Sequence, residues 1–182
     1  MGLIVVTGIP GVGKTTVMKK AAEGMDIEFV TFGTVMADLA IEMKLVKDRD
    51  EMRKLNLEQQ KKLQIKSAEK IARMGNVILD THCTVKTPKG YMPGLPEWVI
   101  KRINPTAIVI VEAASEEIFN RRANDPSRNR DPDTVEQITE HQMMNRAVAM
   151  AYAALSGATV KIVFNHDNAI EDAVKQAAPV LK

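Results

Sequence analysis

The feature that most constrains this chain is a glycine-rich turn near its N-terminus, in the segment LIVVTGIPGVGKTT of residues 3–16. The segment holds a complete G-x-x-x-x-G-K-[ST] pattern, which runs from Gly8 to Thr15. The pattern follows a β-branched apolar run and precedes a helix-forming segment, and this strand–turn–helix context is the one in which it binds phosphate. The sequence therefore predicts an N-terminal βα unit whose turn wraps around the phosphates of a nucleoside triphosphate.

The residue types of this turn match the chemistry of phosphate binding. Glycines let the backbone curve closely and point its N–H groups at an anion, which also experiences the positive end of the following helix. Lys14 is expected to reach the β- and γ-phosphates, the Thr15 hydroxyl to bind Mg²⁺, and Thr16 to add a phosphate contact. The predicted nucleotide-binding residues are Gly8, Ile9, Pro10, Gly11, Val12, Gly13, Lys14, Thr15 and Thr16.

Five short runs have the composition of buried parallel strands, because they are rich in β-branched residues and most are continuously apolar. Helix-forming segments separate them. This alternation predicts an α/β three-layer fold, in which helices flank a five-stranded parallel sheet with right-handed crossovers. The five runs are Leu3–Thr7, Ile27–Phe32, Val77–Asp80, Ala107–Glu112 and Val160–Phe164.

Four helices are predicted between and after these strands. The second has an apolar stripe of Ile65, Ala68, Ile71 and Ala72. The third has Asp131 as its N-cap, Pro132 in its first turn and Gly157 just past its end. The predicted helices are Lys14–Glu23, Asp50–Met74, Asp131–Ser156 and a last one that begins near Asn168.

Composition limits the classes of protein to be considered. With 182 residues, 45% of them hydrophobic, the chain is expected to form one domain with a substantial core over residues 1–182. The net charge of +2 is too small to hold the protein on nucleic acid by its overall field. Its one cysteine, Cys83, fits a reducing compartment. Because no secretory signal or membrane-spanning stretch is found, we expect a cytoplasmic protein.

An acidic residue ends the third predicted strand. Asp80 is expected to orient the water shell of the metal ion bound by the phosphate turn. The alternative is a strand-terminal aspartate that only caps a turn. Asp80 and Thr15 are therefore the predicted metal-binding residues.

The turn alone is shared by GTPases, motors and kinases. A GTPase would need a D-x-x-G switch, but residues 81–83 after Asp80 read Thr-His-Cys and contain no glycine. It would also need an N-K-x-D motif, whereas the last strand ends in Asn-His-Asp at residues 165–167, without the lysine. A motor or transporter would need a longer chain. A small phosphotransferase remains, with residues 165–167 at most a turn near the nucleotide base.

The segment RRANDPSRNRD, residues 121–131, contains four of the nine arginines in the chain. Transfer between two polyanions is opposed by repulsion of roughly 4 kcal/mol for each pair of unit charges at 4 Å. A monophosphate acceptor is already largely ionised near pH 7 and needs no base, but it does need cations, and arginine binds phosphate oxygens in pairs. We expect this segment to form a lid that closes over the phosphates and excludes water. The alternatives are a solvated helix face, or a nucleic-acid arm, which would carry several basic clusters with stacking aromatics.

Six segments together resemble the archaeal-type adenylate kinases, which belong to the superfamily of P-loop nucleoside monophosphate kinases. The resemblance runs nearly end to end and keeps the order of the elements. The segments are GIPGVGKTT, DEMRKL (residues 50–55), DTH (80–82), GYMPGLPEW (90–98), RRANDPSRNRD and NRAVAMAYAALSGATVKIVFN (145–165).

This resemblance implies Mg²⁺-dependent, reversible transfer from ATP to AMP, which gives two molecules of ADP. It implies two mobile parts within the single domain, an AMP-binding flap over about residues 31–73 and a lid over about residues 121–134. ATP, AMP and ADP would be the partners, with no nucleic acid or membrane. Some relatives of this type assemble as trimers, so a homo-oligomer is possible by analogy.

The resemblance also assigns roles to single residues. Arg121 or Arg122 would lie beside the ATP base and phosphates, and Arg128 and Arg130 would reach the transferring group with Asp131 bracing them. The implied catalytic residues are Lys14, Asp80, Arg122, Arg128 and Arg130. The implied AMP-binding residues are Thr31, Gly33, Arg53 and Gly94, with Arg146 as a further phosphate candidate. The alternative for Arg53 and Arg146 is that they are exposed helix arginines without a ligand. The alternative for Gly94 is a rigid turn that does not contact AMP.

The chain departs from the better-known bacterial and eukaryotic adenylate kinases after Asp80, where D-G-F-P-R is replaced by D-T-H-C-T. The arginine expected there is missing, and Lys86, Lys89 or a lid arginine takes its place. The T-G-D of the flap is reduced to T-F-G-T at residues 31–34. For His82 and Cys83, a role in packing or in a hydrogen bond is favoured, and a metal site is not.

Two other functions stay open at this point. One is a related kinase with another small acceptor, such as CMP, UMP or shikimate. The other, from a different class, is a binding protein that ATP switches between shapes and that touches RNA.

Overall fold

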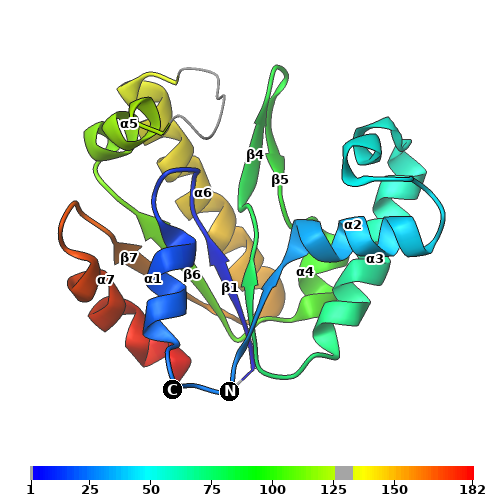
Figure 1. Cartoon of the computed structure of the whole chain (residues 1–182), viewed down its shortest axis with the longest axis horizontal. Coiled ribbons are helices and arrows are strands. Elements are labelled where there is room, and N and C mark those ends of the chain that lie inside the picture. The colour runs from blue at the N-terminus through cyan, green and yellow to red at the C-terminus, as the bar shows by residue number, and fades with distance from the viewer. Residues whose placement is uncertain (1, 126–132) are drawn as a thin grey trace.

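The computed structural model describes residues 2–125 and 133–182. In this part of the chain, five parallel strands form one sheet in the order β2-β3-β1-β6-β7. Helices cover both faces of the sheet, so the predicted α/β three-layer fold is confirmed (Figure 1). The strands are β1 (Leu3–Thr7), β2 (Glu28–Thr31), β3 (Val77–Asp80), β6 (Ala107–Glu112) and β7 (Thr159–Phe164).

The alternation of side chains along β1 divides the core into two layers. Leu3 and Val5 pack into one buried cluster with residues of α2 (Phe32–Glu42), α3 (Leu57–Ala72), α4 (Glu97–Ile103) and the later part of α6 (Val135–Ser156). Ile4 and Val6 point the other way and pack with α1 (Lys14–Ala21), α5 (Ser115–Ala123) and α7 (Ile170–Ala177). A strand that is buried on both faces in this way is expected to be mostly apolar, as β1 is from Leu3 to Val6.

A two-stranded antiparallel hairpin, β4 (Thr84–Thr87) and β5 (Gly90–Pro93), was not predicted from the sequence. It begins four residues after the end of β3 and projects from the same end of the sheet as the loop after β1 (Figure 1). Its base is attached to α6, because the Thr84 hydroxyl donates to Asn145 Oδ1 at 2.6 Å. His141 Nε2 lies 3.0 Å from the same hydroxyl oxygen.

The base of the hairpin is also fixed by a buried tyrosine. The Tyr152 hydroxyl accepts a hydrogen bond from Leu95 N at 3.0 Å and donates one to the Cys83 carbonyl at 2.8 Å. The backbone at Gly94 packs tightly against the backbone at His82, so that a Cβ on Gly94 would lie 1.9 Å from the His82 carbonyl oxygen. Glycine is required here by the close approach of two backbone segments.

The predicted helix Asp50–Met74 is wrong as a single element. The structure has a 3-10 helix, η1 (Arg49–Lys54), followed by a break and then α3. Asn56 starts α3 with a capping box, in which Asn56 accepts from Gln59 N–H and the Gln59 side chain accepts from Asn56 N–H. Ala68 and Ile71 of the predicted apolar stripe are buried, whereas Ala72 is exposed.

The predicted start of the long helix is also wrong. Helix α6 begins at Val135, with Thr134 as its N-cap and Gln137 completing a capping box. The predicted N-cap Asp131 and its neighbour Pro132 lie outside the described residues. The predicted end is confirmed, since the C-cap is Gly157 in the left-handed conformation with φ of 75°.

Other boundaries shift by a few residues. Strand β2 stops at Thr31 because Phe32 already belongs to α2, and β7 gains Thr159. Helix α1 ends at Ala21 and α7 begins at Ile170. A second 3-10 helix, η2 (Ala178–Leu181), closes the chain. Among the described residues, no helix has both the length and the apolar character needed to cross a membrane.

Candidate active site

The phosphate loop, residues 8–15, is folded as a close-fitting turn between β1 and α1. Gly8 and Gly13 both have positive φ, 152° and 78°. A Cβ on Gly8 would lie 2.4 Å from the Val111 carbonyl oxygen, and one on Gly13 would lie 2.7 Å from Asn165 Nδ2. Because α1 begins at Lys14, the first N–H groups of this helix face the loop and have no partner within the helix.

Asp80 lies beside the phosphate loop because β1 and β3 are neighbours in register, with Val6 opposite Asp80. Lys14 Nζ is 3.0 Å from Asp80 Oδ1, and the Thr15 hydroxyl donates to Asp80 Oδ2 at 3.0 Å. Asp80 is only 8% exposed. A hydroxyl and a carboxylate side by side are hard oxygen donors of the kind that Mg²⁺ prefers, so these residues fit the metal that the sequence implies.

His82 follows Asp80 and opens onto a cavity in front of the phosphate loop. Partial burial lowers the pKa of His82, and the charge of Lys14 lowers it further, although Asp80 acts in the opposite direction. Its imidazole is therefore mostly neutral at pH 7. The neighbouring Cys83 is turned inward: its thiol donates to the Asn145 carbonyl at 3.4 Å, and burial raises its pKa to about 12.

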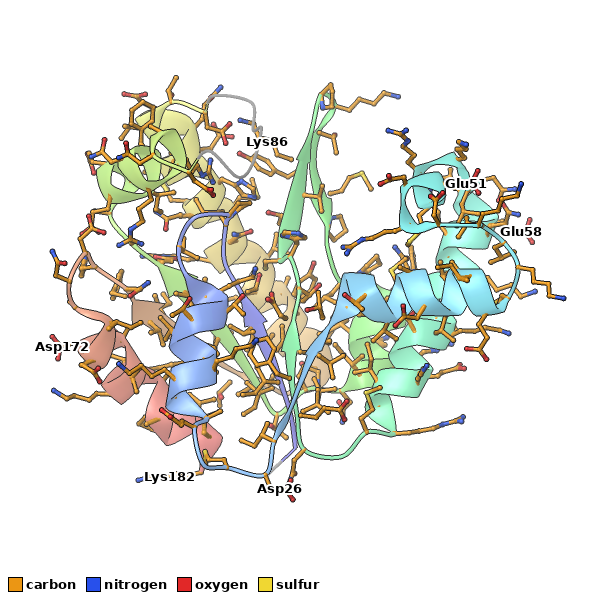
Figure 2. All side chains as sticks on the ribbon, viewed as in Figure 1. Asp26, Glu51, Glu58, Lys86, Asp172 and Lys182 are labelled. Carbon is orange, nitrogen blue, oxygen red and sulfur yellow. The ribbon has the colours of Figure 1, made fainter. Side chains whose placement is uncertain are left out.

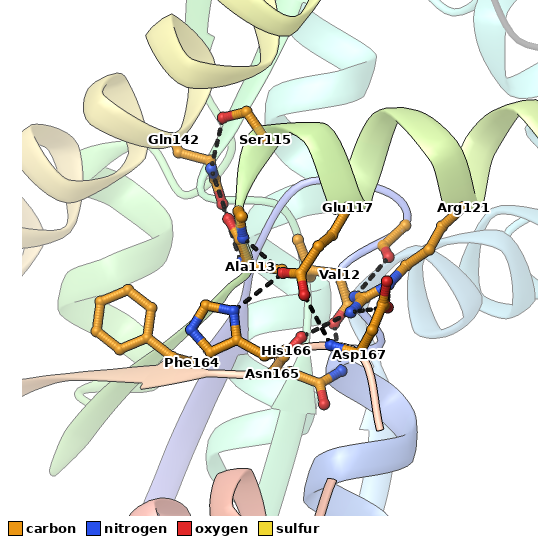
Figure 3. Close-up of polar contacts among 12 residues, drawn as sticks. Val12, Ala113, Ser115, Glu117, Arg121, Gln142, Phe164, Asn165, His166 and Asp167 are labelled. Atoms are coloured by element: carbon orange, nitrogen blue, oxygen red, sulfur yellow. Dashed lines mark hydrogen bonds and ion pairs between the residues drawn. The ribbon is translucent and has the colours of Figure 1, made fainter. Parts of the chain in front are cut away.

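Arg121, in the last turn of α5, joins three parts of the site (Figure 3). Its Nε donates to Asp167 Oδ1 at 2.7 Å and its Nη2 to the Asn165 carbonyl at 2.8 Å. Its Nη1 lies 3.5 Å from the Gly11 carbonyl. The guanidinium thus borders the phosphate loop and the segment between β7 and α7.

Arg122 reaches the other side of the phosphate loop. Its Nε donates to the Pro10 carbonyl at 2.8 Å, and its Nη1 donates to Asp133 Oδ2 at 2.8 Å. The second oxygen of Asp133 accepts from Lys86 Nζ of the hairpin at 2.8 Å. Partial burial would raise the pKa of Asp133, but hydrogen bonds from Lys86 and Arg122 outweigh it and the pKa is lowered.

Glu117 fastens the segment after β7 to α5 (Figure 3). Its carboxylate accepts from the backbone N–H groups of Ala114 and Asp167 at 2.9 and 2.8 Å and lies 3.0 Å from His166 Nδ1. Partial burial opposes ionisation, yet these hydrogen bonds lower the pKa of Glu117 to about 2. The same segment is tied to the phosphate loop, since Asn165 Nδ2 donates to the Val12 carbonyl at 2.8 Å.

Two cavities adjoin the phosphate loop, and Pro10 lines both. The smaller, of about 300 Å³, follows the loop itself; the larger, of about 560 Å³, lies between the loop and the hairpin. The smaller cavity is lined by Ile9, Pro10, Gly11, Gly13, Lys14, Thr15, Thr16, Arg121 and Asp125. The larger is lined by Pro10, His82, Thr84, Val85, Lys86, Thr87, Pro88, Arg122, Asp133 and His141.

The predicted AMP-binding residues come from three parts of the chain. Thr31 is the N-cap of α2, and Gly33 follows in its first turn, where a Cβ would lie 3.4 Å from Arg49 Nη2. Arg53 is exposed on η1. Gly94 lies at the base of the hairpin, in the close approach to the His82 carbonyl.

Two predicted arginines and one further candidate remain. Arg128 and Arg130 lie outside the described residues. Arg146 points at Glu112, which is 2% exposed, and donates to it from Nε at 2.9 Å. In this structure, the guanidinium of Arg146, which was predicted as a phosphate ligand, is therefore paired with the carboxylate of Glu112.

Sequence reasoning did not name Asp133, Asn165 or Arg49 as site residues, although each lies beside a residue that it did name. Asp133 has one signal in the sequence, because it is an acidic residue beside the arginine-rich segment. Asn165 was considered only as part of a GTPase-like motif. The approach of Arg49 to Gly33 depends on the break after η1, which the single predicted helix concealed.

The phosphate loop, its paired lysine and aspartate, and the parallel sheet that aligns them define a P-loop phosphotransferase. A family model described as an AAA domain matches residues 7–139. The chain belongs to the adenylate kinase family, because curated relatives of that name match it over its whole length. The family and the enzyme class predicted from the sequence are thereby confirmed.

These relatives and the chain have identical residues at about half of the aligned positions. The chain is 49% identical to the adenylate kinase of Methanothermobacter thermautotrophicus over 185 residues, covering 100% of both chains. It is 50% identical to that of Methanocaldococcus jannaschii, covering 99% of this chain and 98% of the relative. It is 52% identical to that of Thermoplasma acidophilum, covering 96% and 97%.

Among solved structures, a shikimate kinase from Bacteroides thetaiotaomicron has a similar fold. The TM-score is 0.61 at 14% identity, with 99% of this chain and 98% of that chain covered. A shikimate kinase from Acinetobacter baumannii in complex with shikimate gives a TM-score of 0.58 at 13% identity, with 100% and 93% covered. These likenesses concern the fold alone.

Proposed function

We propose that this protein catalyses the reversible, Mg²⁺-dependent transfer of a phosphoryl group from ATP to AMP, which yields two molecules of ADP. The observation that carries the proposal is the pair of cavities that share Pro10 of the phosphate loop as a lining residue. A donor and an acceptor in these cavities would bring their phosphates to the same point. Close positioning of two reactants is itself a large part of catalysis.

The donor is proposed to bind along the phosphate loop. Residues 8–16 would hold its phosphates, with Lys14 on the β- and γ-phosphates and Arg121 beside the base. Thr15 and Asp80 would hold Mg²⁺, which when bound supplies positive charge to the phosphate oxygens. The present contacts of Asp80 with Lys14 and Thr15 place all three groups within reach of one another.

The acceptor is proposed to be AMP, with its phosphate in the larger cavity. Arg53, Thr31, Gly33 and Gly94 do not line that cavity in this structure and are proposed to hold AMP when the flap closes. Residues 31–73 would form a flap over it within the single domain. Transfer would need no general base, because a monophosphate with a second pKa near 6 is largely a dianion at pH 7. The difficulty is repulsion between polyanions, which Lys14 and the arginines oppose.

Residues 121–134 are proposed to act as the lid of the site. Arg121 and Arg122 already contact the phosphate loop through the Gly11 and Pro10 carbonyls. Arg128 and Arg130 are proposed to reach the transferring phosphoryl group. Water exclusion by such a lid would prevent hydrolysis of ATP.

A coupled assay of ADP formation tests this function. ADP should form rapidly only when ATP, Mg²⁺ and AMP are all present. Faster transfer to CMP, UMP or shikimate would move the protein to another kinase class, and slow hydrolysis independent of any acceptor would indicate a nucleotide-switched binding protein. A compound that joins two adenosines through five phosphates should bind far more tightly than ATP.

We further propose that the protein acts in the cytoplasm, with ATP, AMP and ADP as its partners rather than nucleic acid or membranes. The small net charge and the single, buried cysteine support this. Self-association, as in some relatives, stays a prediction. The exposed methionines Met143 and Met150 of α6, which are 65% and 59% exposed, offer an apolar surface for it. Sedimentation of the purified protein measures the oligomeric state.

A further inference from the structure

The larger cavity is lined by Lys86, a positively charged residue that has no role in the function proposed above. Lys86 lies on β4 and extends toward the side of the molecule formed by α5 and α6 (Figure 2). Its Nζ is 2.8 Å from Asp133 Oδ1, while Arg122 Nη1 is 2.8 Å from Asp133 Oδ2. One carboxylate therefore holds two cations from separate elements, and the trio has a net charge of +1.

Arg122 connects this trio to the reaction centre. Its Nε donates to the carbonyl of Pro10, which belongs to the phosphate loop. Lys86 is thus connected, through Asp133 and Arg122, to the loop that would hold the donor phosphates. Pro10, Lys86, Arg122 and Asp133 line one cavity of about 560 Å³, which has room for the phosphate of a second nucleotide.

The hairpin holds Lys86 in a defined place. Thr84, two residues earlier, lies on the same face of β4 and donates to Asn145 of α6 at 2.6 Å. Val85 lies on the opposite face and is 44% exposed. Because side chains alternate along β4, Lys86 lies on the same face as Thr84 and points toward the cavity. The hydrogen bond of Thr84 to Asn145 limits how far the lysine can move away.

The ion pair of Lys86 is of a kind that can be exchanged. The lysine side chain is 37% exposed and that of Asp133 is 24% exposed, and partly solvated pairs of this type are weak. The hydrogen bond to Asp133 raises the pKa of Lys86, so the lysine is fully charged at neutral pH. A phosphate dianion entering the cavity would be a stronger partner for the ammonium group than a single carboxylate.

We propose that Lys86 binds the phosphate of the acceptor nucleotide in this cavity and takes the place of the arginine that is missing after Asp80. The assignment rests on the proposed function, since it presupposes a monophosphate acceptor. Lys89 is not placed for this role. It lies in the turn between β4 and β5, where its backbone N–H donates to the Thr87 hydroxyl, and it is not among the residues that line the cavity.

Steady-state kinetics of Lys86→Met and the matched control Lys89→Met test this assignment. Both variants remove one exposed lysine charge from the same hairpin. Lys86→Met should raise the KM for AMP by about tenfold or more, because a charge-assisted contact is lost. The KM for ATP should stay within about twofold, and Lys89→Met should resemble the wild type in both constants.

The role is overturned if Lys86→Met leaves the KM for AMP unchanged, if it raises both constants equally, or if Lys89→Met has the larger effect. Lys86→Arg keeps the charge and should restore the KM for AMP to within about threefold of the wild type. Calorimetric titration of each variant with AMP alone gives the same comparison without turnover. If the wild type itself forms no ADP from ATP and AMP, the proposed function fails; if the wild type is active and Lys86→Met keeps its AMP affinity, only the role of Lys86 fails.

Discussion

Lys14 and Asp80 form an ion pair, with Nζ 3.0 Å from Oδ1. The two residues are far apart in the sequence, since Thr15, next to Lys14, already lies 65 positions before Asp80. The pair exists because β1 and β3 are adjacent parallel strands whose carboxyl ends meet at one edge of the sheet. Ligands of open α/β sheets bind at this edge. The pair therefore marks the place where nucleotide phosphates and metal are expected.

Lys14→Met should reduce turnover by on the order of 10²–10³-fold, because the lost charge stabilises chiefly the transferring phosphoryl group. The measurement is the rate of ADP formation at saturating ATP and AMP. Lys19→Met on the same helix is the control, since Lys19 is exposed and lies over the Phe29 ring, away from the loop. Equal losses in the two variants would show that α1 had been disturbed as a whole.

Arg53→Ala should raise the KM for AMP by about tenfold while changing the KM for ATP little, because a guanidinium–phosphate contact with the acceptor is removed. Lys54→Ala is the control. Lys54 lies next in the same 3-10 helix and pairs with Glu51 at 3.1 Å. Steady-state kinetics with each substrate varied in turn separates the two constants, and equal rises in both would remove Arg53 from the acceptor site.

Arg128→Lys and Arg130→Lys should each slow phosphoryl transfer by at least about tenfold, because a lysine cannot make the paired contact of a planar guanidinium. Single-turnover measurements of ADP formation report this step directly. Arg102→Lys is a suitable control, as Arg102 lies on α4 and donates to the Trp98 carbonyl at 2.7 Å. Wild-type rates in both lid variants would disprove the role assigned to these residues.

The central strands β1, β3 and β6 were predictable from the sequence because all their residues are buried, so each strand shows a run of apolar residues. The bounds of β1, β3 and β6 are the predicted ones. The phosphate loop was predictable for a similar reason, since the pattern from Gly8 to Thr15 is contiguous. Asp80 was found because it ends a strand that is itself unmistakable.

The hairpin was not predictable in the same way. Residues 84–93 include two lysines, two prolines and a glycine, and the hairpin stands outside the sheet, so it shows no apolar alternation. Its attachment depends on Asn145 and Tyr152, about sixty residues further along the chain. Contacts over such a separation are set by the packing of α6 and leave no local pattern.

Two helix starts were misplaced although local signals for both were present. Asn56 with Gln59, and Thr134 with Gln137, form capping boxes in the structure. The first was overlooked because the apolar stripe was extended backward through it. The second was overlooked because Asp131 followed by Pro132 also has the pattern of a helix start.

Glu117 should make the stability of the protein depend on pH in the acid range. Its pKa falls from 4.5 to about 2 on folding, because hydrogen bonds from Asp167, His166 and Ala114 outweigh its partial burial. A carboxylate with a lowered folded-state pKa stabilises the fold above its unfolded pKa and loses that contribution as the pH falls through the folded value. The contribution of Glu117 should thus be complete above pH 4.5 and decline between pH 4.5 and about 2.

Thermal unfolding of Glu117→Gln at several pH values measures this contribution. At pH 7 the variant should melt several degrees below the wild type, since hydrogen bonds to a charged group contribute about 1.5–3 kcal/mol and each kcal/mol shifts Tm by about 2–4 °C in a chain of this size. The difference should shrink as the pH is lowered from 4.5 toward 2. Glu116→Gln, the exposed neighbour on α5, should show neither effect. A Tm difference for Glu117→Gln that stayed constant across this range would mean that the carboxylate charge does not fasten the segment after β7 to α5.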